Sequence, residues 1–129
     1  MFEYCFSVSY SDTDKMQCMH HSNYAKYYEN ARWDAFKQLG LSYKNIENEG
    51  IIFPVISLEI KYKKFAKYDD EIKVKTYFKQ IKGARFYIYG EMYNEQDELI
   101  NSAEICIASL NDTTHKPIAV PTKIREIIS

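Results

Sequence analysis

Two carboxylates and two imidazoles stand close together near the start of the chain. Asp12 and Asp14 follow an apolar stretch, and His20 and His21 precede a long aromatic segment. A carboxylate at the junction of a strand and a helix is suited to attack on a carbonyl carbon. The acid supplies a nucleophile or a base, and the free N–H groups of the helix start can hold the oxyanion. The spacing therefore favours chemistry at a carbonyl group.

Other chemistries at this junction meet specific objections. A calcium loop is not expected, because Gln17 stands where such a loop needs Gly and Asn23 stands where it needs Glu. Adjacent histidines at a helix start point in different directions, so His20 and His21 are not expected to bind a metal. A thiol nucleophile needs a base and a third orienting group. Nothing identifies these for Cys18, which we expect to be a small thiol of the core or of a loop.

A strand before the junction and a helix after it must position these residues. Alternating apolar residues predict a strand over residues 2–10. Ser22 is a suitable N-cap for a helix over residues 23–39, and Gly40 is suited to end it. Aromatic residues cover so much of this helix's circumference that we expect other elements to wrap around it.

The remainder of the chain predicts four strands joined by short turns. Ile56, Leu58, Ile60 and Tyr62 alternate with polar residues, and Pro54 should lie near the start of their strand or on an edge. The predicted elements are a short helix over residues 42–49, strands over 51–63, 71–80, 84–93 and 99–110, and a final helical turn over 122–127. Short connections indicate an antiparallel meander. The predicted class is α+β, with a long central α-helix wrapped by an antiparallel sheet of about five strands.

Composition limits the partners that the chain can have. The 129 residues carry 17 basic and 18 acidic side chains, a balance that argues against a nucleic-acid-binding protein. No apolar stretch approaches the roughly 20 residues of a membrane span, and the first residues lack the features of a signal peptide. Cys5, Cys18 and Cys106 have no CxxC spacing, so we expect free thiols in a reducing cytoplasm. The length fits one domain over residues 1–129.

The order of elements and the motif residues resemble a known family. The motif residues are the run Tyr10-Ser11-Asp12-Thr13-Asp14 and, after it, His21, Asn23, Tyr24, Tyr28-Glu29 and Ala31-Arg32. With the segment from Tyr62 to Lys75, they resemble the 4-hydroxybenzoyl-CoA thioesterase-like branch of the hotdog-fold acyl-CoA thioesterases. The resemblance covers nearly the whole chain. It implies a hotdog fold and the hydrolysis of a CoA thioester to a free acid and CoA.

The resemblance also implies roles for particular residues. Asp14, the second acid of the pair, would act on the thioester as nucleophile or general base, and the backbone N–H of His21 would hold the thioester oxygen. Tyr24 would line the acyl pocket, and Lys63 and Lys64 would meet the CoA phosphates across a dimer. Family members are homodimers or homotetramers with active sites between two subunits. No metal or other cofactor is implied.

Some features leave alternatives open. We expect Asp12 to shape the loop by accepting hydrogen bonds from backbone N–H groups. Gln17 stands where the family often has Gly, and Phe65 where it often has Pro, which leaves the acyl preference open. The alternatives are an acyl carrier protein thioesterase, a non-catalytic sensor that binds acyl-CoA, and a cystatin-like helix-on-sheet binding module. The last two give no reason for Asp14 to precede the helix.

Overall fold

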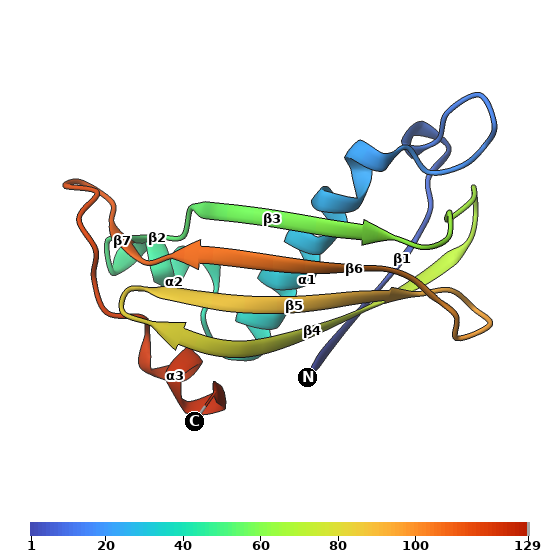
Figure 1. Ribbon diagram of the computed structural model, residues 1–129. Helices are drawn as coiled ribbons and strands as arrows, with labels where there is room; N and C mark the ends of the chain where they lie inside the picture. Colours follow the sequence, from blue (N-terminus) through green and yellow to red (C-terminus); the bar gives the residue numbers. More distant parts are fainter. Residues whose placement is uncertain (129) are drawn as a thin grey trace.

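The protein is built on one antiparallel sheet with a long helix against one face. The computed structural model describes residues 1–128; Ser129, the last residue of the predicted single domain, lies outside them. The five strands have the order β1-β4-β5-β6-β3. Their bounds are β1 Phe2–Ser7, β3 Val55–Tyr62, β4 Glu71–Lys82, β5 Arg85–Tyr93 and β6 Leu99–Ala108. The long helix α1 (Tyr24–Gln38) crosses behind the sheet in Figure 1, so the predicted α+β class is confirmed.

Residues at helical spacing pack α1 on the sheet. Tyr24, Tyr28, Ala31 and Ala35 are all buried, and the helix contacts β4 and β1. Gly40, which follows the helix, has φ of +79°, a left-handed conformation that glycine adopts without strain. The predicted end of the helix is therefore confirmed, and its start is treated with the site below.

Strand β5 makes room for α1 at Gly90. A Cβ atom at Gly90 would come within 2.5 Å of Cε1 of Tyr28. The hydroxyl of Tyr28 donates a hydrogen bond to Oδ1 of Asn101, which is fully buried in β6. Gly90 and Asn101 together fix how closely the middle of α1 approaches the sheet.

The predicted strand over residues 51–63 is divided at Pro54. Strand β2 (Ile51–Ile52) pairs with β7 (Leu110–Asn111) in a separate two-stranded sheet, and β3 begins after the proline. Proline lacks a backbone N–H, so it interrupts the ladder at this point. The prediction of one continuous strand is therefore wrong. The expected position of Pro54, at the start of an edge strand, is confirmed.

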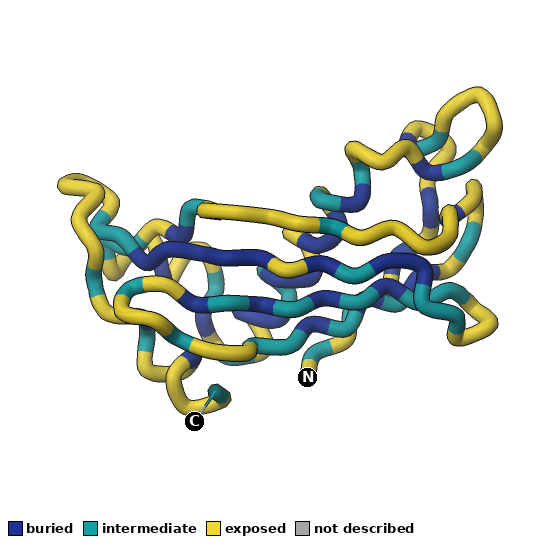
Figure 2. Tube along the Cα trace, viewed as in Figure 1, coloured by how far each residue is buried: buried dark blue, intermediate teal, exposed yellow. Residues whose placement is uncertain are grey.

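Strand β3 leaves apolar side chains open on the face that carries α1. Leu58 pairs with Ile105 and Ile60 pairs with Ala103, and both partners are buried in β6 on the side of the helix. Leu58 itself is 41% exposed, because α1 lies over β4 and β1. Figure 2 shows β3 exposed along most of its length beside the buried strand β6. The inner face of the sheet is therefore bare at this edge.

Smaller elements occupy the two ends of the sheet. Helix α2 (Tyr43–Asn48) lies with β2 and β7 at one end, and the loop between β1 and α1 lies at the other end (Figure 1). Helix α3 (Thr122–Ile128) contacts β4. Among residues 1–128, no helix has both the length and the apolar character needed to cross a membrane.

Candidate active site

Backbone hydrogen bonds hold the loop between β1 and α1 against the turn between β3 and β4. The N–H of Met19 donates to the carbonyl of Ala66 at 2.7 Å, and the N–H of Tyr68 donates to the carbonyl of Gln17 at 2.9 Å. Gln17 has φ of +62°, the left-handed region in which glycine is free of strain. The loop thus lies beside the turn like a short added strand.

Asp12 fastens this loop to α1. It is 3% exposed, and its carboxylate accepts hydrogen bonds from Nζ of Lys26 at 2.7 Å and from the hydroxyl of Tyr27. Burial alone would raise the pKa of Asp12, but the hydrogen bonds from Lys26 and Tyr27 outweigh it and hold the pKa below its usual value. Within residues 1–128, the expected acceptance from backbone N–H groups is met only by Ser9, and the side chains of Lys26 and Tyr27 are the larger partners because the loop folds back onto the helix.

Asp14 lies in the wall of a cavity at the start of the helix. The cavity has a volume of about 320 Å³, and its lining includes Asp14, Met16, His21, Tyr24, Tyr62 and Phe65. Oδ1 of Asp14 accepts a hydrogen bond from the N–H of Met16 at 2.8 Å, so the residue also stabilises a turn. Its other carboxylate oxygen has no hydrogen-bond partner among residues 1–128. That oxygen is free to act on a molecule in the cavity.

The start of the helix differs from the prediction. A short 3-10 turn, η2 (His21–Asn23), precedes α1, and Ser22 lies inside it instead of capping α1. Nδ1 of His20 caps this turn, because it accepts a hydrogen bond from the N–H of Ser22 at 3.2 Å. The N–H of Asn23 donates to the carbonyl of His20 at 3.0 Å. Within residues 1–128 the N–H of His21 has no acceptor, so it can bind an oxygen of a ligand.

Two tyrosines form an uncharged wall of the cavity. The buried hydroxyl of Tyr24 accepts a hydrogen bond from the N–H of Ala66 at 3.1 Å, and its ring meets that of Tyr62 edge to face with centroids 5.3 Å apart. The hydroxyl of Tyr62 donates to the carbonyl of His21 at 3.3 Å. Burial raises the pKa of both hydroxyls, which therefore stay protonated at neutral pH. Among the described residues of the lining, Asp14 alone is acidic.

The two lysines predicted to bind phosphate lie after β3 and outside this lining. Nζ of Lys64 forms an ion pair with Glu98 in the turn between β5 and β6. Lys63 is exposed, and among residues 1–128 its side chain forms no ion pair. Of the two, Lys63 is the freer to meet a phosphate.

The remaining polar residues of the junction also border the cavity. The rings of His20 and His21 lie 4.3 Å apart and are tilted by 32°, and Cys18 is a half-buried free thiol. In the described part of the chain, residues 1–128, no three His, Cys, Asp or Glu side chains gather as a metal-binding group. These side chains serve as walls of the cavity.

Sequence reasoning missed several residues of the site. The missed residues are Met16, Met19, Tyr62 and Phe65 in the lining, and Lys26 and Tyr27, which hold Asp12. Phe65 is 71% exposed, and a large apolar side chain in a lysine-rich turn was the available signal. Lys26 carried no such signal, since a lysine on a helix is usually solvated.

Comparison with known proteins assigns the family. Residues 8–128 match the family model of the thioesterase-like superfamily. The chain belongs to this superfamily. The predicted family and the predicted class of enzyme, a thioester hydrolase, are therefore confirmed.

Named relatives match this thioesterase over most of its length. It is 26% identical over 124 residues to the acyl-CoA thioester hydrolase YbgC of Escherichia coli O157:H7. The aligned region covers 96% of this chain and 92% of YbgC. It is 33% identical over 115 residues to YneP of Bacillus subtilis, and this aligned region covers 86% of this chain and 80% of YneP.

Solved structures share the fold of this thioesterase. The DHNA-CoA thioesterase of Staphylococcus aureus has a TM-score of 0.86 at 36% identity, over 92% of this chain and 79% of that one. The protein AQ1494 of Aquifex aeolicus has a TM-score of 0.91 at 24% identity, over 100% of both chains. The predicted hotdog fold is therefore confirmed.

Proposed function

We propose that this thioesterase hydrolyses an acyl-CoA thioester to a free acid and CoA, with the carboxylate of Asp14 acting at the carbonyl carbon. The observation that carries the proposal is the cavity that holds Asp14 together with the N–H of His21, which has no acceptor among residues 1–128. Two relatives support the substrate class by their names, an acyl-CoA thioester hydrolase and a DHNA-CoA thioesterase.

Two routes fit this arrangement. In one, the carboxylate of Asp14 attacks the carbonyl carbon, the carbon–sulfur bond breaks to release the CoA thiolate, and water then hydrolyses the mixed anhydride. In the other, Asp14 takes a proton from a water molecule that attacks the same carbon. Both routes place negative charge on the thioester oxygen. The N–H of His21, at the positive end of the helix, would donate a hydrogen bond to that oxygen. Tyr24 would form the wall beside the acyl group.

The CoA moiety is proposed to reach the basic segment after β3. Lys63 has an exposed side chain that can meet a phosphate. Lys64 would have to exchange its ion pair with Glu98 for the phosphate. The exchange costs little, because both side chains of that pair are about half exposed and such pairs are weak in water.

We also propose that the working form is a homodimer or a homotetramer that pairs through β3. This strand is an unpaired edge with exposed Val55, Ile56 and Leu58, and such an edge is normally covered. Residues 1–129 are assigned to one thioesterase domain. A cytoplasmic location is supported by the three free thiols, Cys5, Cys18 and Cys106, which fit a reducing compartment.

The test is thiol release from a panel of acyl-CoA substrates. Asp14→Asn retains an oxygen that can accept the hydrogen bond from Met16, so the turn is kept while the charge is lost. We expect kcat/KM to fall about 100-fold or more, the scale of losing a catalytic base or nucleophile. Asp34→Asn, on the far half of α1 and outside the cavity, is the matched control and should retain full activity.

The alternatives give different results in the same assay. Full activity of Asp14→Asn would remove Asp14 from the mechanism. Tight acyl-CoA binding without turnover would favour the sensor, and turnover of acyl carrier protein thioesters alone would favour that substrate class. No binding and no turnover of any thioester would contradict the proposed function as a whole.

A further inference from the structure

Asn23 occupies the N-cap position of α1 but does not cap the helix. Asparagine is favoured at this position because its side-chain oxygen can accept a hydrogen bond from a backbone N–H of the first turn. Here Asn23 has φ of −87° and ψ of −17°, in the helical region, and its side chain makes no capping hydrogen bond. Its amide nitrogen, Nδ2, instead donates to the backbone carbonyl of Asp12 at 2.9 Å, 11 residues earlier in the chain. The side chain of Asn23 therefore serves the loop that carries Asp14 and not the helix.

The carbonyl of Asp12 joins this loop to the start of the helix. It accepts a second hydrogen bond, from the N–H of His20 at 2.8 Å. Two residues after Asp12, the N–H of Asp14 donates to the carbonyl of Cys18 at 3.0 Å, which holds the backbone of the acid within the loop. The position of Asp14 relative to α1 therefore depends on the donors that hold the carbonyl of Asp12.

The backbone N–H of Asn23 acts on the other partner of the site. It donates to the carbonyl of His20 at 3.0 Å. The peptide bond between His20 and His21 is trans, so its N–H points in the opposite direction to its carbonyl. Since the carbonyl points toward the helix start, the N–H of His21 points away from the helix backbone, and His21 lines the cavity of Asp14. Asn23 therefore orients the N–H that is proposed to hold the thioester oxygen.

Resting on the proposed function, we propose that Asn23 is a positioning residue, which sets the spacing and orientation between the carboxylate of Asp14 and the N–H of His21. Its Nδ2 holds the acid-bearing loop, and its backbone N–H holds the peptide group that carries the oxyanion donor. Reacting groups must be held within a narrow range of distance, and a misplacement of about 1 Å can cost about 100-fold in rate. Asn23 acts through these two groups and does not itself touch the substrate.

Other contacts keep the loop folded when the amide group of Asn23 is removed. The carboxylate of Asp12 still accepts hydrogen bonds from Lys26 and Tyr27, and its carbonyl still accepts one from the N–H of His20. The bond from the backbone N–H of Asn23 is kept in every substitution except proline, which alone has no N–H. A change of the side chain should therefore alter the alignment of the site more than the stability of the fold.

The first test removes the donor and keeps the shape of the side chain. Asn23→Asp loses the N–H groups, and at neutral pH its carboxylate cannot donate to the carbonyl of Asp12. Aspartate is as favourable as asparagine at an N-cap, and its charge suits the positive end of the helix, so a purely structural role predicts no loss. With the best acyl-CoA substrate of the wild type, we expect kcat to fall about 10- to 100-fold and KM to stay unchanged, because the oxyanion forms only in the transition state. Asn23→Ala, which removes the donor without adding a charge, should show the same loss.

The affinity for hexyl-CoA gives a second reading of the same variants. This thioether has no carbonyl oxygen, so its binding does not use the N–H of His21. We expect its dissociation constant to be the same in Asn23→Asp and in the wild type. Weaker binding of hexyl-CoA would mean that Asn23 shapes the cavity as a whole, and it would overturn the positioning role.

A double variant tests whether Asn23 acts through Asp14. Residues that act as a unit in one transition state have effects that are far from additive. In the Asp14→Asn background, Asn23→Asp should therefore lower kcat by less than about threefold, although it costs at least about tenfold in the wild type. Two losses that multiply in full would show that Asn23 acts independently of Asp14, and they would overturn the inference.

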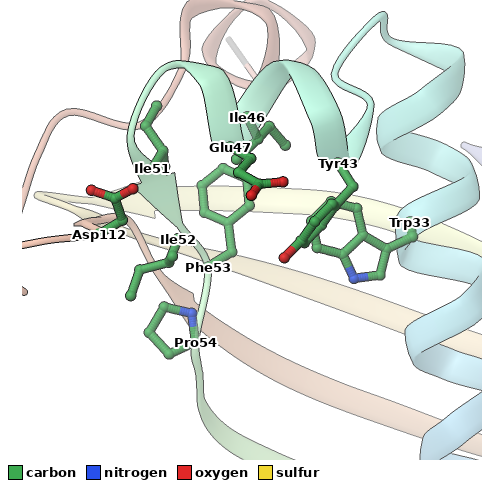
Figure 3. A pocket seen from close by; sticks show the side chains of 9 residues that line it. All are labelled: Trp33, Tyr43, Ile46, Glu47, Ile51, Ile52, Phe53, Pro54 and Asp112. Atoms are coloured by element: carbon green, nitrogen blue, oxygen red, sulfur yellow. The ribbon is translucent and has the colours of Figure 1, made fainter.

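Asn45 in α2 provides a matched control. Its Nδ2 donates to the backbone carbonyl of Gly40 at 3.2 Å, so Asn45→Asp removes the same kind of hydrogen bond. Helix α2 borders a different cavity of about 280 Å³, and Figure 3 shows Tyr43 and Ile46 of this helix beside it. Among residues 1–128, the lining of that cavity shares no residue with the lining of the Asp14 cavity. Asn45→Asp should keep the kcat of the wild type, and both aspartate variants should melt within about 5 °C of it.

Failure of this inference differs from failure of the proposed function. Wild-type kcat in Asn23→Asp and in Asn23→Ala, with activity lost in Asp14→Asn, would overturn the role of Asn23 and leave the proposed function standing. A rise in KM without a fall in kcat would also overturn it, because Asn23 would then act in substrate binding. Wild-type protein without activity on any thioester, or full activity of Asp14→Asn, would overturn both.

Discussion

The loop that carries Asp14 should depend on the buried carboxylate of Asp12. In Asp12→Asn the shape of the side chain is kept and the charge is lost. The hydrogen bond from the hydroxyl of Tyr27 is buried and charge-assisted, and such a bond contributes about 1.5–3 kcal/mol. The ion pair with Lys26 contributes about 1 kcal/mol or less, because the lysine side chain is 50% exposed.

These two terms predict a loss of about 2–4 kcal/mol in the free energy of unfolding. For a domain of this size each kcal/mol lowers the melting temperature by about 3 °C, so we expect Asp12→Asn to melt about 6–12 °C lower. Thermal unfolding followed by circular dichroism measures the shift. Asp34→Asn is the matched control, because within residues 1–128 the carboxylate of Asp34 accepts a hydrogen bond from Gln38 alone; this variant should melt within about 1 °C of the wild type.

A double-mutant cycle tests the physical reason for the effect. Tyr27→Phe removes the hydroxyl donor, and it should cost much less in the Asp12→Asn background than in the wild type, with a coupling energy above about 1 kcal/mol. Two additive losses, with coupling under about 0.5 kcal/mol, would refute the reasoning. The hydrogen bond between Asp12 and Tyr27 would then not be the source of the stability.

Further predictions concern the sheet, the helix and pH. Gly90→Ala should lower the free energy of unfolding by about 1–3 kcal/mol in urea titration, because the added Cβ meets the ring of Tyr28. Tyr28→Phe should cost about 1–3 kcal/mol in the same assay, since it removes the donor to a buried amide oxygen. Arg32→Met should be neutral or stabilising by about 1 kcal/mol, because burial lowers the pKa of this guanidinium and its Nε has no partner among residues 1–128. Because the pKa of Asp12 is lowered in the folded protein, its stabilising effect is complete above the unfolded pKa of about 3.9 and is lost as pH falls through the folded pKa. Urea titrations between pH 6 and pH 3 should therefore show a smaller loss in the free energy of unfolding for Asp12→Asn than for the wild type.

Patterns local in the sequence predicted the helix and most of the sheet. The periodic aromatic residues and Gly40 located α1, and the alternation of apolar residues located β4 and β5. Pro54 was placed at the start of an edge strand. The division of that segment into β2 and β3 was not foreseen, because β2 pairs with β7, which lies far along the chain.

The sequence pointed to Asp14 as a candidate site residue, but it did not predict the residues that pack around the candidate site. Asp14 was singled out because a carboxylate before a helix start, together with the other motif residues, is typical of chemistry at a carbonyl group, and it lies in the lining of the cavity. The bond from Asp12 to Tyr27 and the approach of Tyr62 and Phe65 depend on how the chain folds back on itself. No spacing rule in a single sequence reports such contacts.

The hydrogen bonds from Met19 and Tyr68 tie the first twenty residues to a turn about fifty residues later. Closing a loop of that length is slow compared with forming the local hairpins of β4, β5 and β6. The end of the molecule that carries Asp14 should thus be the last part to form during refolding. A chain with its sheet assembled but without these hydrogen bonds would have near-native circular dichroism and no turnover. The recovery of activity would therefore lag behind the recovery of structure.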